Sequence, residues 1–123
     1  AGVVVSNHGG RQLDSAISTA RALDEIQQAT GGSIELHVDG GIRRGSDVLK
    51  AMALGAKAVW LGRPVLHGLA WAGTSGVSFA LSLLRNELDE AMALAGVTSL
   101  ADIPSDLLAG PWRGPHGGDS LRP

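Results

Sequence analysis

A unit that occurs three times constrains the fold more than any other feature: a short apolar run followed by a polar, glycine-containing loop. The runs are residues 3–6 (VVVS), 34–39 (IELHVD) and 58–61 (AVWL), and each is followed by a loop, NHGGR, GGIRRG and GRP respectively. Short runs rich in β-branched residues are typical of strands that are buried on both faces. Because helical patterns separate the runs, the sequence predicts parallel strands joined by right-handed crossovers.

Amphipathic helices are predicted in the intervals between the runs. The first is expected to begin at the N-cap residue Ser18 and to end at Gly31, and the second to begin at Ser46 or Asp47 and to end at Gly55. Their inward faces consist of apolar residues at helical spacing, namely Ala22, Leu23, Ile26 and Ala29 in the first helix, and Val48, Leu49, Met52 and Ala53 in the second.

The sequence after Pro64 is predicted to be helical. A short helix is expected over 66–72, a longer one from near Ser75 to Gly96, and a last short one within 98–108. The apolar face of the longer helix would carry Leu81, Leu84, Leu88, Met92 and Ala95. Residues 109–123 are rich in glycine and proline and are expected to be a disordered tail, which leaves residues 1–108 as the folded part.

Three parallel strands alone leave two open edges, so the predicted sheet belongs to a larger architecture. A doubly wound sheet and a (β/α)₈ barrel of about 250 residues both satisfy this requirement. The doubly wound sheet lacks support because no G-x-G-x-x-G string follows the first run. The fold class predicted is therefore α/β, the last three βα units of a TIM barrel, and the chain is expected to be a piece of a larger domain.

Composition excludes several classes of function. A net charge of −2 disfavours nucleic acid or an anionic membrane surface as the main partner. The chain has no cysteine, and its four histidines lack metal-ligand spacing, so thiol chemistry and a metal site are not expected. No apolar run approaches the roughly 20 residues that span a bilayer. A cytoplasmic protein is expected, with a membrane-associated parent as the alternative.

The strand-end loops carry the chemistry. In a barrel, the loops after the last two strands are the usual phosphate site. Here those loops offer glycine backbone and the planar cations of Arg43 and Arg63. In the first loop, His8 can accept a proton near neutral pH and Arg11 can bind a carboxylate with two parallel hydrogen bonds. A turn glycine, a surface arginine and a loop histidine are the alternatives for each residue taken singly. His37 and His67 are expected to have packing or surface roles.

These strings resemble a known family. SNHGGRQLD closely resembles the active-site motif of the FMN-dependent α-hydroxy acid dehydrogenases and oxidases, which include glycolate oxidase, L-lactate dehydrogenase and mandelate dehydrogenase. The segment VDGGIRRGSDVLKAMALGAKAVWLGRP resembles the one that follows in that family, although other phosphate-binding barrels carry similar strings. The resemblance covers residues 1–108.

The resemblance implies a TIM barrel, bound FMN, a small 2-hydroxy acid substrate and often a homotetramer. By position, it implies that His8 is the catalytic base that also contacts substrate and that Arg11 binds the substrate carboxylate. It implies that the cofactor is bound by Ser6, by the first phosphate loop (Asp39, Gly40, Gly41, Ile42 and Arg43) and by the second (Gly62 and Arg63). Whether the substrate loses a proton or a hydride from its α-carbon stays open.

Two function classes remain. The first is a C-terminal piece of a flavin oxidoreductase that oxidises 2-hydroxy acids to 2-oxo acids. The second is a phosphate- or FMN-binding barrel fragment without redox activity of its own. The family's lysine, tyrosines and histidine-orienting aspartate belong to the first five strands, and this chain contains no tyrosine. The isolated chain is therefore expected to be inactive.

Overall fold

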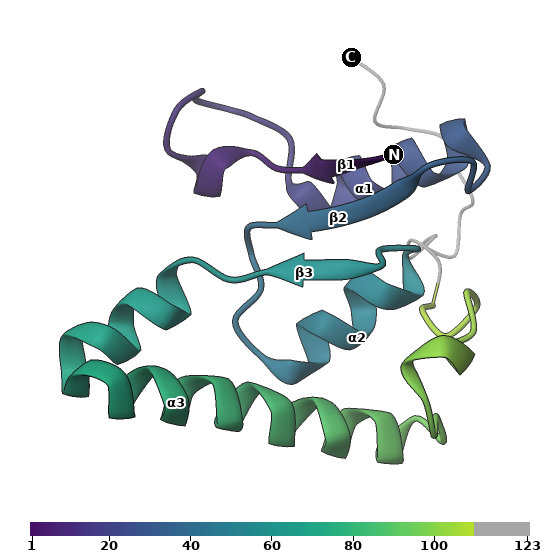
Figure 1. Ribbon diagram of the computed structural model, residues 1–123. Coiled ribbons are helices and arrows are strands. Elements are labelled where there is room, and N and C mark those ends of the chain that lie inside the picture. Colours follow the sequence, from purple (N-terminus) through teal and green to yellow (C-terminus); the bar gives the residue numbers. More distant parts are fainter. Residues whose placement is uncertain (110–123) are drawn as a thin grey trace, which may run out of the picture.

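A three-stranded parallel sheet forms the centre of the molecule (Figure 1). The computed structural model describes residues 1–109. The strands are β1 (Gly2–Val5), β2 (Glu35–Asp39) and β3 (Ala58–Trp60), in the order β1-β2-β3. In the register, Val4 pairs with His37, and His37 pairs with Ala58. The predicted parallel arrangement is confirmed, and the carboxyl ends of all three strands meet at one edge (Figure 1).

Two helices connect the strands at nearly the predicted positions. The first, α1 (Thr19–Thr30), is capped by Ser18, whose Oγ accepts the Arg21 N–H at 3.4 Å. It ends at Gly31, which adopts the left-handed conformation (φ 57°). The second, α2 (Gly45–Ala53), begins slightly earlier than Ser46, because Asp47 lies in its first turn and accepts backbone N–H groups from the preceding loop.

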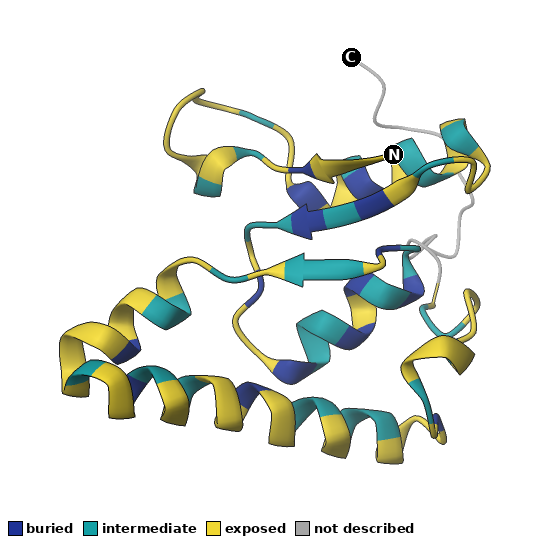
Figure 2. Ribbon diagram, viewed as in Figure 1, coloured by how far each residue is buried: buried dark blue, intermediate teal, exposed yellow. Residues whose placement is uncertain are grey.

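The core lies between the sheet and these two helices. Leu36 and Val38 of β2 pack with Val5, with Leu23 of α1 and with Ala51 of α2. Because Leu36 and Val38 lie on the same face of the strand, both helices cover that one face. Leu23 and Leu36 are fully buried, and Figure 2 shows buried residues concentrated where sheet and helices meet.

The prediction that the first strand is buried on both faces was wrong for the described residues. Val3 and Val4 are 45% and 51% exposed. β1 lies at one edge of the sheet, and within residues 1–109 no helix covers the face that carries Val4. Ala29 was also misplaced: it is exposed on the outer side of α1.

The chain then forms two helical segments, together labelled α3 (Arg63–Leu94), that fold back on each other as a hairpin (Figure 1). The break falls at Ala72 (φ −149°) and Gly73 (φ 59°, ψ −138°), at the last residue of the predicted short helix and the first residue of the predicted gap. The first segment begins at Arg63, earlier than predicted, because Gly62 precedes the helix and Pro64 suits its first turn.

The predicted apolar face of the longer segment is only partly buried. Leu84 is buried and Leu88 and Met92 are half-buried, whereas Leu81 and Ala95 are exposed. A long row of exposed residues along this segment is visible in Figure 2. No helix within residues 1–109 is long and apolar enough to cross a membrane.

Two single turns of 3₁₀ helix complete the described elements: η1 (His8–Gly10) and η2 (Leu100–Asp102). A short helix was predicted within 98–108, but only the single turn η2 forms there. Its first turn is capped by Ser99, and Pro104 follows soon afterwards, which disfavours continuation. The tail predicted for 109–123 lies, apart from Ala109, outside the described residues.

Candidate functional site

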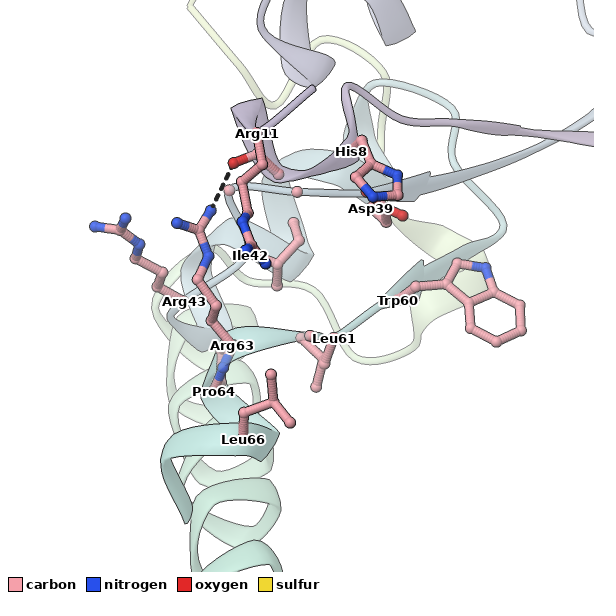
Figure 3. Close-up of a pocket in the computed structure, with 14 residues that line it drawn as sticks. His8, Arg11, Asp39, Ile42, Arg43, Trp60, Leu61, Arg63, Pro64 and Leu66 are labelled. Carbon is pink, nitrogen blue, oxygen red and sulfur yellow. Dashed lines mark hydrogen bonds between the residues drawn. The ribbon is translucent and has the colours of Figure 1, made fainter. Parts of the chain in front are cut away.

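A cleft of about 290 Å³ opens at the end of the sheet where the carboxyl ends of the three strands lie (Figure 3). The loops after all three strands contribute to it, as expected for parallel strands whose ends share one edge. The structure places every predicted site residue except Ser6 along this cleft, namely His8, Arg11, Asp39, Gly40, Gly41, Ile42, Arg43, Gly62 and Arg63. Residues far apart in the sequence are therefore brought to one cavity.

Ser6 lies outside the lining but joins two of the loops. Its Oγ donates a hydrogen bond to Asp39 Oδ1 at 2.7 Å and accepts the His8 N–H at 3.0 Å. Asp39 is the last residue of β2 and Ser6 follows the last residue of β1. This bridge fixes the His8 backbone relative to the second loop.

The loop that carries His8 has an unusual backbone. His8, Gly9 and Gly10 have φ values of 55°, 67° and 71°, all in the left-handed region. Residues other than glycine rarely adopt this region, so the two glycines are needed for the path of the chain as well as for access to the cleft. The Gly10 N–H closes the turn by donating to the Asn7 carbonyl at 3.0 Å. The turn directs His8 toward the cleft (Figure 3).

Three arginines make the cleft cationic. Arg11, Arg43 and Arg63 gather on one side of it, and Trp60 lies on the other (Figure 3). Arg63 Nη2 donates to the Gly9 carbonyl at 3.2 Å, which links the third loop to the first. Among the described residues, none of the three arginines forms an ion pair. Their charge is therefore available to an anion.

The backbone around these arginines also suits an anion. Gly40 and Gly41 have φ values of 87° and 83°, which keeps side chains out of the second loop. No side chain caps the N-terminus of α3, where Gly62 precedes Arg63. An anion bound there would meet the positive end of the helix dipole and the N–H of Arg63. Pro64 has no N–H, and the Val65 N–H already donates to the Gly62 carbonyl at 3.1 Å.

Comparison with known proteins identifies the family. The profile of the family described as FMN-dependent dehydrogenase matches residues 1–110. The chain belongs to this family. The resemblance inferred from the two motifs is thus confirmed, and so, at the level of the family, is FMN as its cofactor.

Individual relatives agree with the family. The chain is 58% identical over 106 residues to an L-lactate oxidase of Nostoc sp., covering 86% of this chain and 29% of that protein. It is 52% identical over 107 residues to human 2-hydroxyacid oxidase 2, and the match covers 87% of this chain and 30% of that protein. A crystal structure of mandelate oxidase with (S)-2-phenylpropionate superposes with a TM-score of 0.80 at 55% identity. The match covers 85% of this chain and 31% of that one. The chain thus spans about 30% of the length of the curated relatives it matches.

Several residues of the site were not predicted. Trp60 and Leu66 add apolar surface to the cleft, and buried Thr19 donates from Oγ1 to the Gly40 carbonyl at 2.9 Å. Asp47 was considered only as a helix start, yet its Oδ2 accepts the N–H groups of Arg43 and Arg44, both at 3.0 Å. An acidic residue in the first turn of a helix is the sequence signal that would have indicated this role.

The two other histidines of the described chain lie outside the cleft, as predicted. His67 is exposed on α3. His37 Nε2 lies 2.8 Å from Glu35 Oε1, and its Nδ1 lies 3.3 Å from Trp60 Nε1. The hydrogen bond with His37 lowers the pKa of the Glu35 carboxyl below its ordinary value. Within residues 1–109, no three histidine, aspartate or glutamate side chains cluster in a way that could hold a metal ion.

Proposed function

We propose that this chain supplies the base, the carboxylate anchor and the phosphate site of an enzyme that oxidises a 2-hydroxy acid to a 2-oxo acid with FMN as electron acceptor. The observation that carries the proposal is that His8 and Arg11 line the same cleft as Arg43 and Arg63. The names of the relatives, L-lactate oxidase and 2-hydroxyacid oxidase 2, support this substrate class.

The proposed enzyme is a complete TIM barrel in which residues 1–108 are the last three βα units. Support comes from the three-stranded parallel sheet, which within the described residues has two unpaired edges and a face without helices. In such a barrel, β2 and β3 would be strands seven and eight, whose following loops usually bind phosphate. A homo-oligomer, a tetramer by family resemblance, is part of the proposal.

The residues present fit the phosphate end of FMN. Arg43 and Arg63 can each bind a phosphate through paired N–H donors. The positive φ values of Gly40 and Gly41 allow the backbone to approach an anion closely, and the N-terminus of α3 lacks a side-chain cap. Asp39, hydrogen-bonded to Ser6, adds an acceptor for cofactor hydroxyl groups beside these donors. When bound, FMN supplies the two-electron acceptor.

The roles of the protein side chains follow from their chemistry. Arg11 would hold the substrate carboxylate through two N–H donors and so orient the 2-hydroxy group and the α-carbon toward His8. An imidazole nitrogen of His8 would accept the proton that the substrate releases, since histidine can be neutral at physiological pH and bind a proton there. The Ser6 bridge would hold the His8 backbone during this transfer.

The test uses the full-length protein, loaded with FMN and mixed with 2-hydroxy acids in the absence of oxygen. We expect His8→Ala to retain FMN but to bleach the flavin band roughly 10²–10⁴-fold more slowly, because it lacks the base. His67→Ala, on the exposed side of α3, is the matched control and should bleach normally. Near-normal bleaching in His8→Ala would refute the role of His8. If the wild-type protein binds FMN but no 2-hydroxy acid bleaches the bound flavin, the alternative is favoured, a barrel without redox activity.

A further inference from the structure

The start of α2, directly behind the second loop, is held by carboxylates from two elements. The N–H groups of Arg43 and Arg44 donate to Asp47 Oδ2, each at 3.0 Å. The next N–H along the chain, that of Gly45, donates to Glu87 Oε2 of α3 at 2.9 Å. Three successive N–H groups are therefore already bound by protein carboxylates, and an anion in the cleft must use other donors.

The Glu87 contact is enforced by close packing. Gly45 is buried, and a Cβ atom added to it would overlap the backbone nitrogen of Leu88. The start of α2 thus touches the α3 backbone directly, a distance that only glycine permits. Glu87 is half-buried beside this contact, so its carboxylate has little freedom to leave the Gly45 N–H.

The same helical hairpin serves both sides of the cleft. Its first residue, Arg63, lines the cleft directly. Its second segment carries Glu87, which holds the backbone two residues after Arg43. Because the direction of the Arg43 side chain depends on that backbone, α3 sets the spacing between the two cations.

On the basis of the function proposed above, we propose that Glu87 is a positioning residue for the FMN phosphate. It holds the Gly45 N–H and so fixes the backbone from which Arg43 reaches into the cleft, without touching the cofactor. Its charge also lies at the N-terminus of α2, where a negative group is favourable. Glu87 would thereby act on the phosphate end of the flavin and leave the ring end unaffected.

The decisive measurement compares FMN with riboflavin, which has the same ring but no phosphate. Dissociation constants are obtained from quenching of flavin fluorescence in the full-length protein. We expect Glu87→Ala to weaken FMN binding about tenfold, with riboflavin binding unchanged, because a displaced Arg43 would lose about one charge-assisted hydrogen bond to the phosphate. Glu87→Gln should keep most of the preference for FMN, because its amide oxygen can still accept the Gly45 N–H. Glu90→Ala, exposed on the same helix, is the matched control.

Each outcome decides a separate point. Equal weakening of FMN and riboflavin in Glu87→Ala would show a merely structural role and overturn the inference. If Glu87→Ala does not fold, Glu87→Asp replaces it, because the shorter aspartate side chain should not reach Gly45. An unchanged ratio of FMN to riboflavin affinity in Glu87→Asp would also overturn the inference. Arg43→Ala tests the underlying function. If it too leaves that ratio unchanged, the phosphate assignment itself fails, and the inference about Glu87 fails with it.

Discussion

At the scale of single residues, the site depends on a backbone conformation that side-chain patterns do not reveal. His8 has φ 55°, which costs a residue other than glycine on the order of 1–3 kcal/mol. The bonds to Ser6 Oγ and between Gly10 and Asn7 oppose this cost. Residue type and spacing were enough to predict that His8 and Arg11 lie together at the strand ends, where both line the cleft, but not the turn that presents them.

Arg11 gives a prediction at this scale. Arg11→Lys keeps the positive charge but loses the planar pair of N–H donors, so a carboxylate would be held by a single point charge. We expect a higher KM for the 2-hydroxy acid and a kcat/KM lowered by about tenfold or more, with FMN affinity unchanged. Steady-state kinetics at saturating FMN provide the measurement. An unchanged KM would mean that the carboxylate is bound elsewhere.

Residues in contact only through the tertiary fold were the ones missed. Thr19 binds the Gly40 carbonyl from 21 positions away, and Glu87 meets Gly45 from 42 positions away. Asp47 was missed as well, although its contacts are local and an acidic residue in the first turn of a helix is a recognisable signal. Nothing in the sequence around Glu87 distinguishes it from Asp89 or Glu90 on the same helix. The motifs predicted the groups that face the cleft, whereas the groups that support the loops required coordinates.

At the scale of elements, the hairpin in α3 is the feature that the sequence predicted least completely. The sequence predicted a short helix and a longer one with a break between residues 72 and 75, and a break is present at Ala72 and Gly73. The close packing of the two segments was not predicted. Gly68 and Gly76 are buried against each other at the point where the segments meet. Glycines within a helical pattern ordinarily disfavour a helix, whereas here they let the two helical segments pack closely.

Gly76→Ala tests this crossing. The new methyl group would overlap the Gly68 carbonyl, and a backbone atom cannot move aside as a flexible side chain can. We expect the free energy of unfolding to fall by roughly 1–3 kcal/mol, as in other overpacked sites, despite the better helix propensity of alanine. Thermal unfolding of the full-length protein at saturating FMN is the measurement. Ser78→Ala, exposed on the same segment, is the control. A melting temperature equal to that of wild type would show that the segments can separate without cost.

At the scale of the whole molecule, the fold class followed from the repeated unit, while burial did not. The order and direction of the strands could be predicted because polar loops follow each apolar run. Val4 and Trp60 were harder to judge, since a sheet face is buried only if something covers it, and both are more than half exposed here. A strand sequence indicates that the strand can be buried on both faces, but it does not indicate which segment would cover each face.

The exposed edges and face of the sheet predict how the 123 residues behave on their own. Within residues 1–109, the two unpaired sheet edges and the exposed apolar side chains of Val4 and Trp60 favour association. We expect the isolated chain to bind FMN weakly or not at all, to aggregate, and to oxidise no 2-hydroxy acid. Size-exclusion chromatography and anaerobic flavin bleaching provide the measurements. A monomer that bleached FMN as fast as the full-length protein would show that no further strands are needed.

The link between Gly45 and Glu87 also sets an order of events during synthesis. A ribosome adds Gly45 first and Glu87 only 42 residues later. At about 5–20 residues per second, the second loop exists for roughly 2–8 s before the carboxylate that caps its helix has been made. The second loop therefore reaches the shape described here only after Glu87 has been added.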